Sequence, residues 1–328
     1  MVYLKEIEGV RGMSWKWNKS GSLTYLTLPK WQAAGIDLGF STRVGGFGRV
    51  PYDSFNLGFH VGDDPTTVLE NRKYWLDQWG VPFSRVAVGE QVHGTNVLWV
   101  KEEDGGRGSC ELETAIPDTD GLVTQSAVGL MAFFADCVPL FFYYPDLQAI
   151  GIAHAGWKGT AHKIGQKVLE CFEEAGGCTE EAWVAIGPSI GPCCYLVDER
   201  VVAQFRSNYQ ETPFLHRQED GNYRLDLWEA NKTLLMRKGV RPENIDVAST
   251  CTADNPEWFF SHRRDGARTG RMAGWIKLRG SRFEVREVRS RRGYERRKCG
   301  NHPLASPLSN FELRISNFDK GGVRWRKF

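Results

Sequence analysis

The chain has 328 residues, of which 41% are hydrophobic and 12% aromatic, so it can bury a large core and is not a disordered protein. Its net charge of +2 is unevenly divided, because residues 279–328 carry 14 basic and 5 acidic side chains, whereas residues 1–278 carry 28 and 35. The acidic balance of residues 1–278 argues against a general nucleic-acid surface there.

The longest apolar run, residues 128–144, has 17 residues and contains Asp136 and Pro139. It is therefore shorter than the roughly 20 residues that span a bilayer. The N-terminal residues mix both charges without an apolar stretch, unlike a secretory signal. The eight cysteines form no C-x-x-C pair. We therefore expect a cytoplasmic monomer with reduced thiols and with no membrane partner and no specific nucleic-acid partner.

Residues 1–278 form one predicted domain, because Gly, Pro and aromatic residues are spread evenly along them and no long Ser/Pro/Gly linker divides them. Residues 279–328 are basic and lack helical or strand periodicity, which predicts a poorly ordered C-terminal tail. The organisation expected from the sequence is thus one catalytic domain followed by a tail.

Several segments rich in Val, Leu or Trp and bounded by Gly or Asp predict short strands. Three nearly continuous apolar runs follow, the pattern of strands that are buried on both faces. A further apolar segment precedes a Gly/Pro turn. In chain order, the predicted strands are 85–90, 96–100, 121–124, 129–134, 140–144, 149–153 and 182–186.

Two helices are also predicted. Residues 160–175 place apolar side chains at a spacing of four and end before Gly176 and Gly177. Residues 226–238 begin with an Asp-x-x-Glu sequence and end before Gly239. Because strands outnumber helices and both are mixed along the chain, the class is α+β or α/β with a buried mixed sheet.

His93, Cys137 and His154 each follow a predicted strand and precede a turn, so the three side chains can meet at the strand ends. Two imidazoles and one thiolate form the ligand set of a catalytic zinc site, whose fourth position is open to water or substrate. The spacing is not a standard zinc motif, so three unrelated core or turn residues remain an alternative. Another is a Cys137 thiolate nucleophile with a histidine as its base.

Two glycine-rich turns have weaker signals. Arg43 precedes Gly45 and Gly46, and such a turn can hold an anion through its N–H groups and the guanidinium, although an ordinary surface turn has the same composition. Residues 187–191 match the Gly-x-Ser-x-Gly pattern of a hydrolase elbow. Pro188 and Pro192 do not suit a turn that enters a helix, so the second segment is interpreted as a structural turn.

Eight short motifs cover about residues 30 to 278 in the order found in one protein family. They are STRVGG at 41–46, NLGFHVGDD at 56–64, QVHG at 91–94, DTDG at 118–121, ADCVP at 135–139, HAGWKGT at 154–160, GPSIGPCCY at 187–195, and DG with TGRM within 265–272. The succession resembles the YfiH-type family. Its members were described as laccase-domain or multicopper polyphenol oxidase proteins and are now regarded as purine nucleoside phosphorylases.

The resemblance implies a single α+β domain with two mixed β-sheets between helix layers, similar to the catalytic domains of certain cysteine-dependent bacterial toxins. It implies zinc held by His93, Cys137 and His154. It also implies phosphorolysis of adenosine, inosine, guanosine and methylthioadenosine, with adenosine deamination in the same pocket. Copper-dependent phenol oxidation has less support, because laccases need several copper centres and the chain has seven histidines. The His-x-Glu and Pro-Cys-x-x-Cys signature of zinc deaminases is absent.

Phosphorolysis needs an anion site, support for the sugar cation and a proton for the departing purine. Arg43 with the Gly45 and Gly46 amides is the predicted anion site, and Asn56 and Gln91 are predicted to bind ribose or base edges. Asp136, beside Cys137, is predicted either to transfer a proton or to orient a ligand histidine. The alternatives left open are a Cys137 hydrolase acting, for instance, on peptidoglycan precursors, and a binding protein without catalytic activity.

Overall fold

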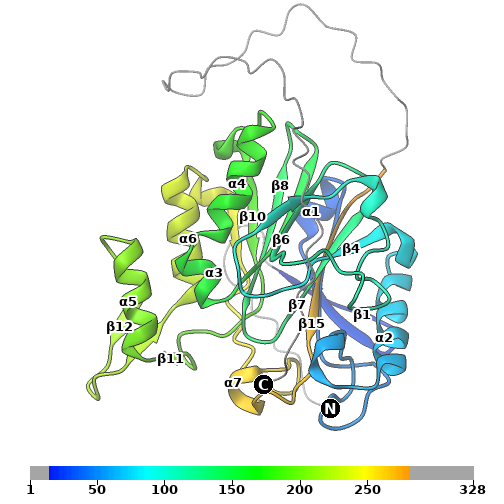
Figure 1. Cartoon of the computed structure of the whole chain (residues 1–328), viewed down its shortest axis with the longest axis horizontal. Helices are drawn as coiled ribbons and strands as arrows, with labels where there is room; N and C mark the ends of the chain where they lie inside the picture. The colour runs from blue at the N-terminus through cyan, green and yellow to red at the C-terminus, as the bar shows by residue number, and fades with distance from the viewer. Residues whose placement is uncertain (1–14, 281–328) are drawn as a thin grey trace, which may run out of the picture. The chain divides into compact units, whose positions relative to one another are not determined.

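The computed structural model describes residues 15–280 (Figure 1). Contacts separate one unit, Met1–Glu284, from a second, Val285–Phe328. The second unit lies outside the described residues, as does the predicted tail beyond Gly280. The domain boundary predicted at residue 278 therefore stays a prediction.

Two six-stranded mixed sheets form the centre of the described part of the chain. The first has the order β1 (Lys16–Ser20), β2 (Leu23–Thr27), β3 (Ile36–Ser41), β15 (Met272–Leu278), β7 (Gly129–Phe134), β4 (Val86–Val88). The second has the order β14 (Ile245–Val247), β10 (Trp183–Ile186), β8 (Val138–Tyr144), β9 (Ala149–Ala155), β6 (Gly121–Thr124), β5 (Val97–Trp99). The pairs β4 with β7, β10 with β14 and β5 with β6 are parallel, and the other neighbours are antiparallel.

The continuous apolar runs are explained by burial on both faces of each sheet. In β8, Leu140 and Phe142 pack toward the helices, whereas Phe141 and Tyr143 pack between the two sheets. This alternation is the two-residue period of a strand, and each face meets a different apolar layer. The predicted strands 121–124 and 129–134 are confirmed with identical bounds.

The helices of the described part have the bounds α1 Pro29–Ala33, α2 Pro65–Asp77, α3 Trp157–Ala161, α4 Ile164–Glu174, α5 Glu199–Asn208, α6 Leu227–Lys238 and α7 His262–Asp265. Helix α2 lies on the outer side of the first sheet, and α3, α4 and α6 lie on the outer side of the second (Figure 1). The predicted arrangement of two mixed sheets between helix layers is therefore confirmed. A small third sheet, β11 (Leu196–Val197), β13 (Tyr223–Leu225) and β12 (Leu215–Arg217), lies beside α5.

The predicted helix 160–175 is in fact two helices. Lys163 adopts a left-handed backbone with φ 69°, which ends α3 and redirects the chain into α4. The glycine terminator after α4 is confirmed, since Gly176 has φ 92° and the Gly177 N–H donates to the Phe172 carbonyl at 2.9 Å. The second prediction, 226–238, is confirmed with Asp226 as the N-cap of α6.

The chain crosses between the two sheets at two places that matter for function. Residues 89–96 lead from β4 in the first sheet to β5 in the second, and residues 135–137 lead from β7 to β8. Both crossings reach the same end of β9. The β7–β8 crossing does so because Val138 pairs with Ala155, and the β4–β5 crossing because Val97 pairs with Gly121, which pairs with Ala153. The two crossings bring side chains from far apart in the sequence to the same edge of the double sheet.

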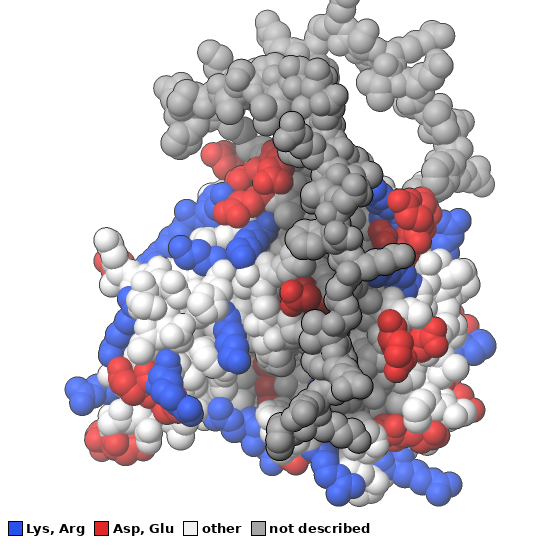
Figure 2. Space-filling model, in the orientation of Figure 1, with Lys and Arg blue, Asp and Glu red and all other residues white. Residues whose placement is uncertain are grey.

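Basic and acidic side chains are interspersed on the face drawn in Figure 2. On that face the mixture fits the prediction that residues 1–278 lack a broad basic surface. Within residues 15–280, the helices are all too short or too polar to cross a bilayer.

Candidate metal centre and its pocket

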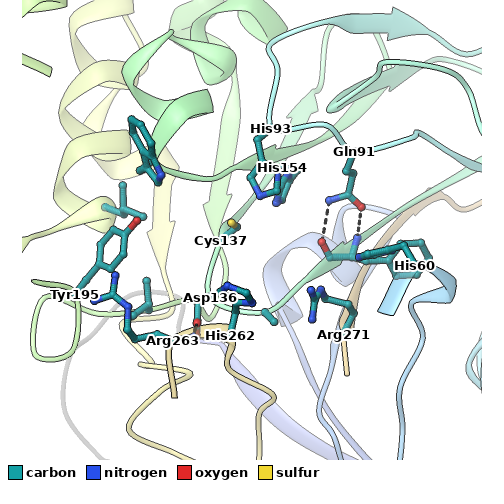
Figure 3. A pocket seen from close by; sticks show the side chains of 15 residues that line it. His60, Gln91, His93, Asp136, Cys137, His154, Tyr195, His262, Arg263 and Arg271 are labelled. Carbon is teal, nitrogen blue, oxygen red and sulfur yellow. Dashed lines mark hydrogen bonds between the residues drawn. The ribbon is translucent and has the colours of Figure 1, made fainter. Parts of the chain in front are cut away.

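His93, Cys137 and His154 meet where the two sheets are joined (Figure 3). His93 comes from the β4–β5 crossing, Cys137 from the β7–β8 crossing, and His154 from β9, which extends two residues further than predicted. Their ligand atoms all lie within 4.8 Å of one another, and the two imidazole rings are 4.8 Å apart. The predicted cluster of two imidazoles and one thiol is therefore formed.

Asp120, a residue given no role from the sequence, organises this cluster. It is 3% exposed, and its Oδ1 lies 2.7 Å from Nδ1 of His154. The same carboxylate accepts hydrogen bonds from the backbone amides of Val92, His93 and Gly94, at 2.8 to 3.1 Å. These bonds fix the left-handed turn at His93, φ 60°. Because Asp120 contacts Nδ1 of His154, Nε2 is the ring nitrogen that remains available to bind a metal.

The electrostatics of the cluster favour a charged thiolate. Burial would raise the pKa of Cys137, but the charges of His154 and His93 and their hydrogen bonds lower it to about 6. Burial would likewise lower the pKa of His154, but Cys137 and Asp120 raise it to about 9. For Asp120 itself, burial is outweighed by its hydrogen bonds to His154 and the turn amides, so its pKa is lowered. Without a metal, the group is thus a thiolate beside an imidazolium near neutral pH.

We expect metal-free protein to be alkylated at Cys137 by iodoacetamide with a half-maximal rate near pH 6. The reason is that the thiolate is the nucleophile, and it forms above a pKa that the two histidines hold at about 6. Peptide mass spectrometry measures the rate at each cysteine, with exposed Cys110 as an internal reference. A Cys137 rate that rises only near pH 8.5, as for an ordinary thiol of pKa about 8.5, would contradict the ion pair.

A pocket of about 410 Å³ contains the cluster. It is lined by His60, Gln91, His93, Phe133, Ala135, Asp136, Cys137, His154, Trp157, Ile190, Tyr195, Leu227, His262, Arg263 and Arg271. Figure 3 shows Tyr195 and Arg263 on one side of Cys137 and Arg271 on the other. Two guanidinium groups, aromatic rings and a metal-ligand set therefore face one cavity, which suits a ligand with an anionic part and a flat part.

Several pocket residues were missed by sequence reasoning. Arg271 lies in the TGRM motif, and its Nη1 donates to the carbonyls of Thr269 and Gly270 at 2.8 and 3.0 Å. Burial, together with the positive charges of Arg271 and Arg72, lowers the pKa of His60 to about 4, so His60 is neutral. Arg263 stacks on the ring of Tyr195 at 4.8 Å. The motifs could have indicated Arg271 and Tyr195, but nothing in their spacing shows which cavity they face.

Asp136 lines the pocket, yet its carboxylate is already bonded. Its Oδ1 accepts from the Thr252 hydroxyl at 2.7 Å, and its Oδ2 accepts from the Ser261 hydroxyl at 3.0 Å and the Arg263 amide at 2.6 Å. It thereby holds the loop before α7 against the β7–β8 crossing. The contact that orients a ligand histidine, one of the two roles predicted for Asp136, is made by Asp120 instead. The proton-transfer role stays a prediction.

Of the two residues predicted to bind ribose or base edges, Gln91 lines the pocket and Asn56 does not. The side-chain amide of Gln91 both donates to and accepts from the backbone of Phe133 at 2.8 Å (Figure 3). Asn56 is fully buried and bonds to Gly58, Asp63 and the Arg271 amide. Asn56 therefore positions the backbone of Arg271, and it is not among the residues that line this pocket.

The predicted anion site, formed by Arg43, Gly45 and Gly46, is also not part of the lining of this pocket. The Arg43 guanidinium pairs with Asp53 at 3.2 Å and donates to the carbonyls of Asp53 and Pro256. The amides of Gly45 and Gly46 each donate to the Ser54 hydroxyl at 3.1 Å. The donors of this turn are thus used within the protein, and an anion-binding role for Arg43 stays a prediction without a supporting contact.

The Gly187–Gly191 segment is a buried turn. The hydroxyl of Ser189 accepts a hydrogen bond from the Trp228 indole at 2.7 Å, and Ser189 is fully buried. The segment continues into Cys193 and Cys194 with no helix directly behind Ser189. The structural interpretation of this turn is therefore confirmed, and the hydrolase elbow is not formed.

The donor set fits a zinc ion by its chemistry. Two imidazoles and a thiolate converge from three separate elements. The Asp120 carboxylate contacts Nδ1 of His154, as in zinc sites where a carboxylate accepts a hydrogen bond from a ligand histidine. Gly156 lies directly against the cluster and leaves space for it, because a Cβ there would lie 3.0 Å from the Cys137 sulfur and 3.3 Å from the His93 ring. Because all three residues of the cluster line the pocket, a metal held by them would supply its chemistry to a ligand bound there.

Comparison with known proteins places the chain. The family described as "Multi-copper polyphenol oxidoreductase laccase" matches residues 37–279. The purine nucleoside phosphorylase YlmD of Geobacillus stearothermophilus is 42% identical over 250 residues, which cover 75% of this chain and 91% of that protein. The purine nucleoside phosphorylase YfiH of Escherichia coli is 34% identical over 257 residues, which cover 78% of this chain and all of that protein.

A solved structure agrees with these sequence matches. The crystal structure of YlmD from Geobacillus stearothermophilus superposes with a TM-score of 0.77 at 40% identity, covering 80% of this chain and 99% of that one. The order of the motifs, the double-sheet fold and the convergence of two histidines and a cysteine all agree with this likeness. The chain therefore belongs to the laccase-domain family that contains the YlmD and YfiH proteins.

Proposed function

We propose that the protein is a zinc-dependent purine nucleoside phosphorylase acting on adenosine, inosine, guanosine and methylthioadenosine, with adenosine deaminase activity in the same pocket. The observation that carries the proposal is the cluster of His93, Cys137 and His154 in a cavity that also presents Arg263 and Arg271. The relatives named as purine nucleoside phosphorylases support the substrate class.

Zinc would be held by His93, Cys137 and His154, and when bound it supplies a Lewis acid that polarises an oxygen or a bound water. The protein's own groups do the remaining work. Arg271 and Arg263 line the pocket. Each uses its Nη1 on backbone carbonyls, which leaves Nε and Nη2 of both guanidinium groups for a phosphate beside the ribose. Aromatic walls from Trp157 and Tyr195 suit a purine ring, since flat apolar faces stack on bases.

His60 and Asp136 complete the proposed arrangement. A neutral His60 can both accept and donate a hydrogen bond, so it suits a ribose hydroxyl or a phosphate oxygen. Asp136 keeps the α7 segment, and with it Arg263, at the pocket wall through its bond to the Arg263 amide. A proton relay to the leaving purine through Asp136 would require it to release one of its three donors. Positioning is therefore its better supported role.

A second function is favoured by one observation. The cluster also resembles a catalytic triad. Asp120 contacts His154, which can act as a base, and His154 contacts Cys137, a nucleophile whose pKa is lowered to about 6. A thiol hydrolase built on these residues would work without metal and would form a covalent intermediate at Cys137. The two functions thus make opposite predictions about chelation.

Phosphate-dependent release of hypoxanthine from inosine is the test, made on protein of measured zinc content. We expect release to need both phosphate and zinc, and to fall after chelation. We expect Arg271→Ala to raise the apparent KM for phosphate at least about 10-fold, because a bidentate charge-assisted contact is lost, with zinc content unchanged. Arg43→Ala is the matched comparison.

Two outcomes would count against the proposal. Activity that survives chelation, with covalent labelling of Cys137 by substrate, would favour the thiol hydrolase. If Arg43→Ala raises the phosphate KM and Arg271→Ala does not, the anion site lies at the turn first predicted from the sequence. Ammonia release from adenosine, measured in the same samples, tests the deaminase activity separately.

A further inference from the structure

A second cluster of metal-binding side chains lies outside the residues that hold the proposed zinc. Cys193 and Cys194 follow the turn after β10, and Cys251 lies in the segment after β14. Their three sulfur atoms all lie within 4.8 Å of one another. We propose that these thiols form a second metal site, which takes a thiophilic d10 cation and prefers Cu(I) to Zn²⁺.

The backbone holds the three thiols together. Ser189 and Cys251 form a parallel bridge, in which the Ser189 amide donates to the Thr250 carbonyl at 3.2 Å and the Thr252 amide to the Ser189 carbonyl at 3.0 Å. The Cys194 amide donates to the Gly191 carbonyl at 3.0 Å, which closes a tight turn around the vicinal pair. The thiols therefore converge because two segments more than 50 residues apart are joined at this point.

Gly191 is the residue that allows this approach. Its N–H donates to the Cys251 sulfur at 3.2 Å, which holds the two segments in contact. A Cβ at this position would lie 3.2 Å from the Cys251 Cβ and 2.7 Å from the Trp228 ring. A larger residue would push the two segments apart and open the cluster.

Charge and access also suit a bound cation. Arg224 donates from Nη1 to the carbonyls of Pro192 and Cys193, which puts a positive charge next to a group that would carry three thiolates. Cys251 is 6% exposed, Cys194 is half-buried and Cys193 is exposed, so one side of the site is buried and the other is open to solvent. An ion can therefore enter from solvent and end in partly dry surroundings.

The donor set indicates the class of cation. Three sulfur ligands without a histidine select soft ions, and three thiolates complete the coordination of a trigonal Cu(I) ion. Zinc held by three protein ligands needs a water or substrate to complete its four-coordinate shell, as proposed for the first cluster, whereas a trigonal Cu(I) ion needs no further ligand. The proposed zinc cluster differs in having two imidazoles, and the two sites can therefore hold different metals in one molecule.

A cation at this site would also hold the pocket wall. Cys194 precedes Tyr195, which lines the pocket, and Cys251 precedes Thr252, whose hydroxyl donates to Asp136 at 2.7 Å. Crosslinking the two segments through a metal would keep both neighbours in place. The proposal does not depend on the phosphorylase activity, because its test reads metal binding.

The test uses full-length, reduced protein under anaerobic conditions, titrated with Cu(I) against a chromogenic Cu(I) chelator. A His93→Ala background disables the first cluster. We expect this protein to keep one Cu(I) equivalent, and Cys193→Ser in the same background to weaken its binding by about 100-fold or more, since a direct ligand is lost. Cys110→Ser, an exposed thiol elsewhere, is the matched control and should change nothing.

A parallel titration with Zn²⁺ should show weaker retention by the same three thiols. Equal Cu(I) affinity in Cys193→Ser and Cys110→Ser would overturn the proposal. So would a disulfide joining two of the three cysteines in protein prepared without reductant, combined with no Cu(I) retention after reduction. Because Cys193 is exposed, its variant tests the site even if Cys251→Ser fails to fold.

Discussion

Replacing His93 or Cys137 with alanine is expected to lower phosphate-dependent base release by at least about 10³-fold and to remove bound zinc in the same step. Each variant leaves two of three protein ligands, and the donors come from separate elements, so neither of the others can shift to compensate. Steady-state release of hypoxanthine from inosine, together with metal analysis of the same samples, measures both effects.

His216→Ala and Cys110→Ala are the matched controls, because both residues are exposed and lie outside the cluster. They should keep zinc and activity. If Cys137→Ala loses turnover but retains the full zinc content, the thiol acts as a nucleophile and the metal assignment is wrong. If both variants keep turnover, the pocket is not the active site.

Asp120→Asn is expected to weaken zinc binding by about 10- to 100-fold, the cost typical of losing a carboxylate behind a histidine ligand. Asp120→Ala should in addition destabilise the fold by several kcal/mol, because three hydrogen bonds from the 92–94 turn to a buried carboxylate are lost, at about 1.5–3 kcal/mol for each bond to a charged group. Competition with a chromogenic zinc chelator gives the affinity, and urea unfolding of metal-free protein gives the stability.

The pH dependence has a definite sign. Because the folded pKa of Asp120 is lowered, its carboxylate stabilises the fold fully at neutral pH, and that stabilisation is lost as the pH falls through the folded pKa. The difference in unfolding free energy between the natural protein and Asp120→Asn should therefore shrink in acid. Asp118→Asn, a change at an exposed neighbour, is the control. A difference that stays constant down to pH 2 would contradict the role of this carboxylate.

The parts of the fold that were predictable are those with a strong local pattern. Strand β7 was predicted with its observed bounds from a nearly continuous apolar run, and β6 from a short segment rich in Val and Leu that is bounded by Gly or Asp. Helices α2 and α5 were missed, although Asp64 before Pro65 and Asp198 before Glu199 are N-cap signals. The break at Lys163 could not be predicted, because lysine is an ordinary helix residue and its type does not indicate a left-handed backbone.

The candidate site, like the fold, could be predicted only in part. The convergence of His93, Cys137 and His154 could be predicted because each lies near a strand end and all three are of residue types that bind metals. The partners of the charged residues could not, because they are set by tertiary contacts. Arg43 donates to the carbonyl of Pro256, 213 residues away, and Asp120 meets His154 across two strands. No local pattern distinguishes an Arg that binds substrate from one that binds the backbone.

The pairing of β8 with β9 holds the thiol and one imidazole of the cluster to the same sheet. Cys137 directly precedes β8, whose Val138 pairs with Ala155 of β9, and His154 is the residue before Ala155. The His93 amide donates to Asp120, which adjoins β6 of that sheet. The geometry of the cluster is therefore set within one sheet, and we expect small sliding of the other sheet to leave the three side chains together.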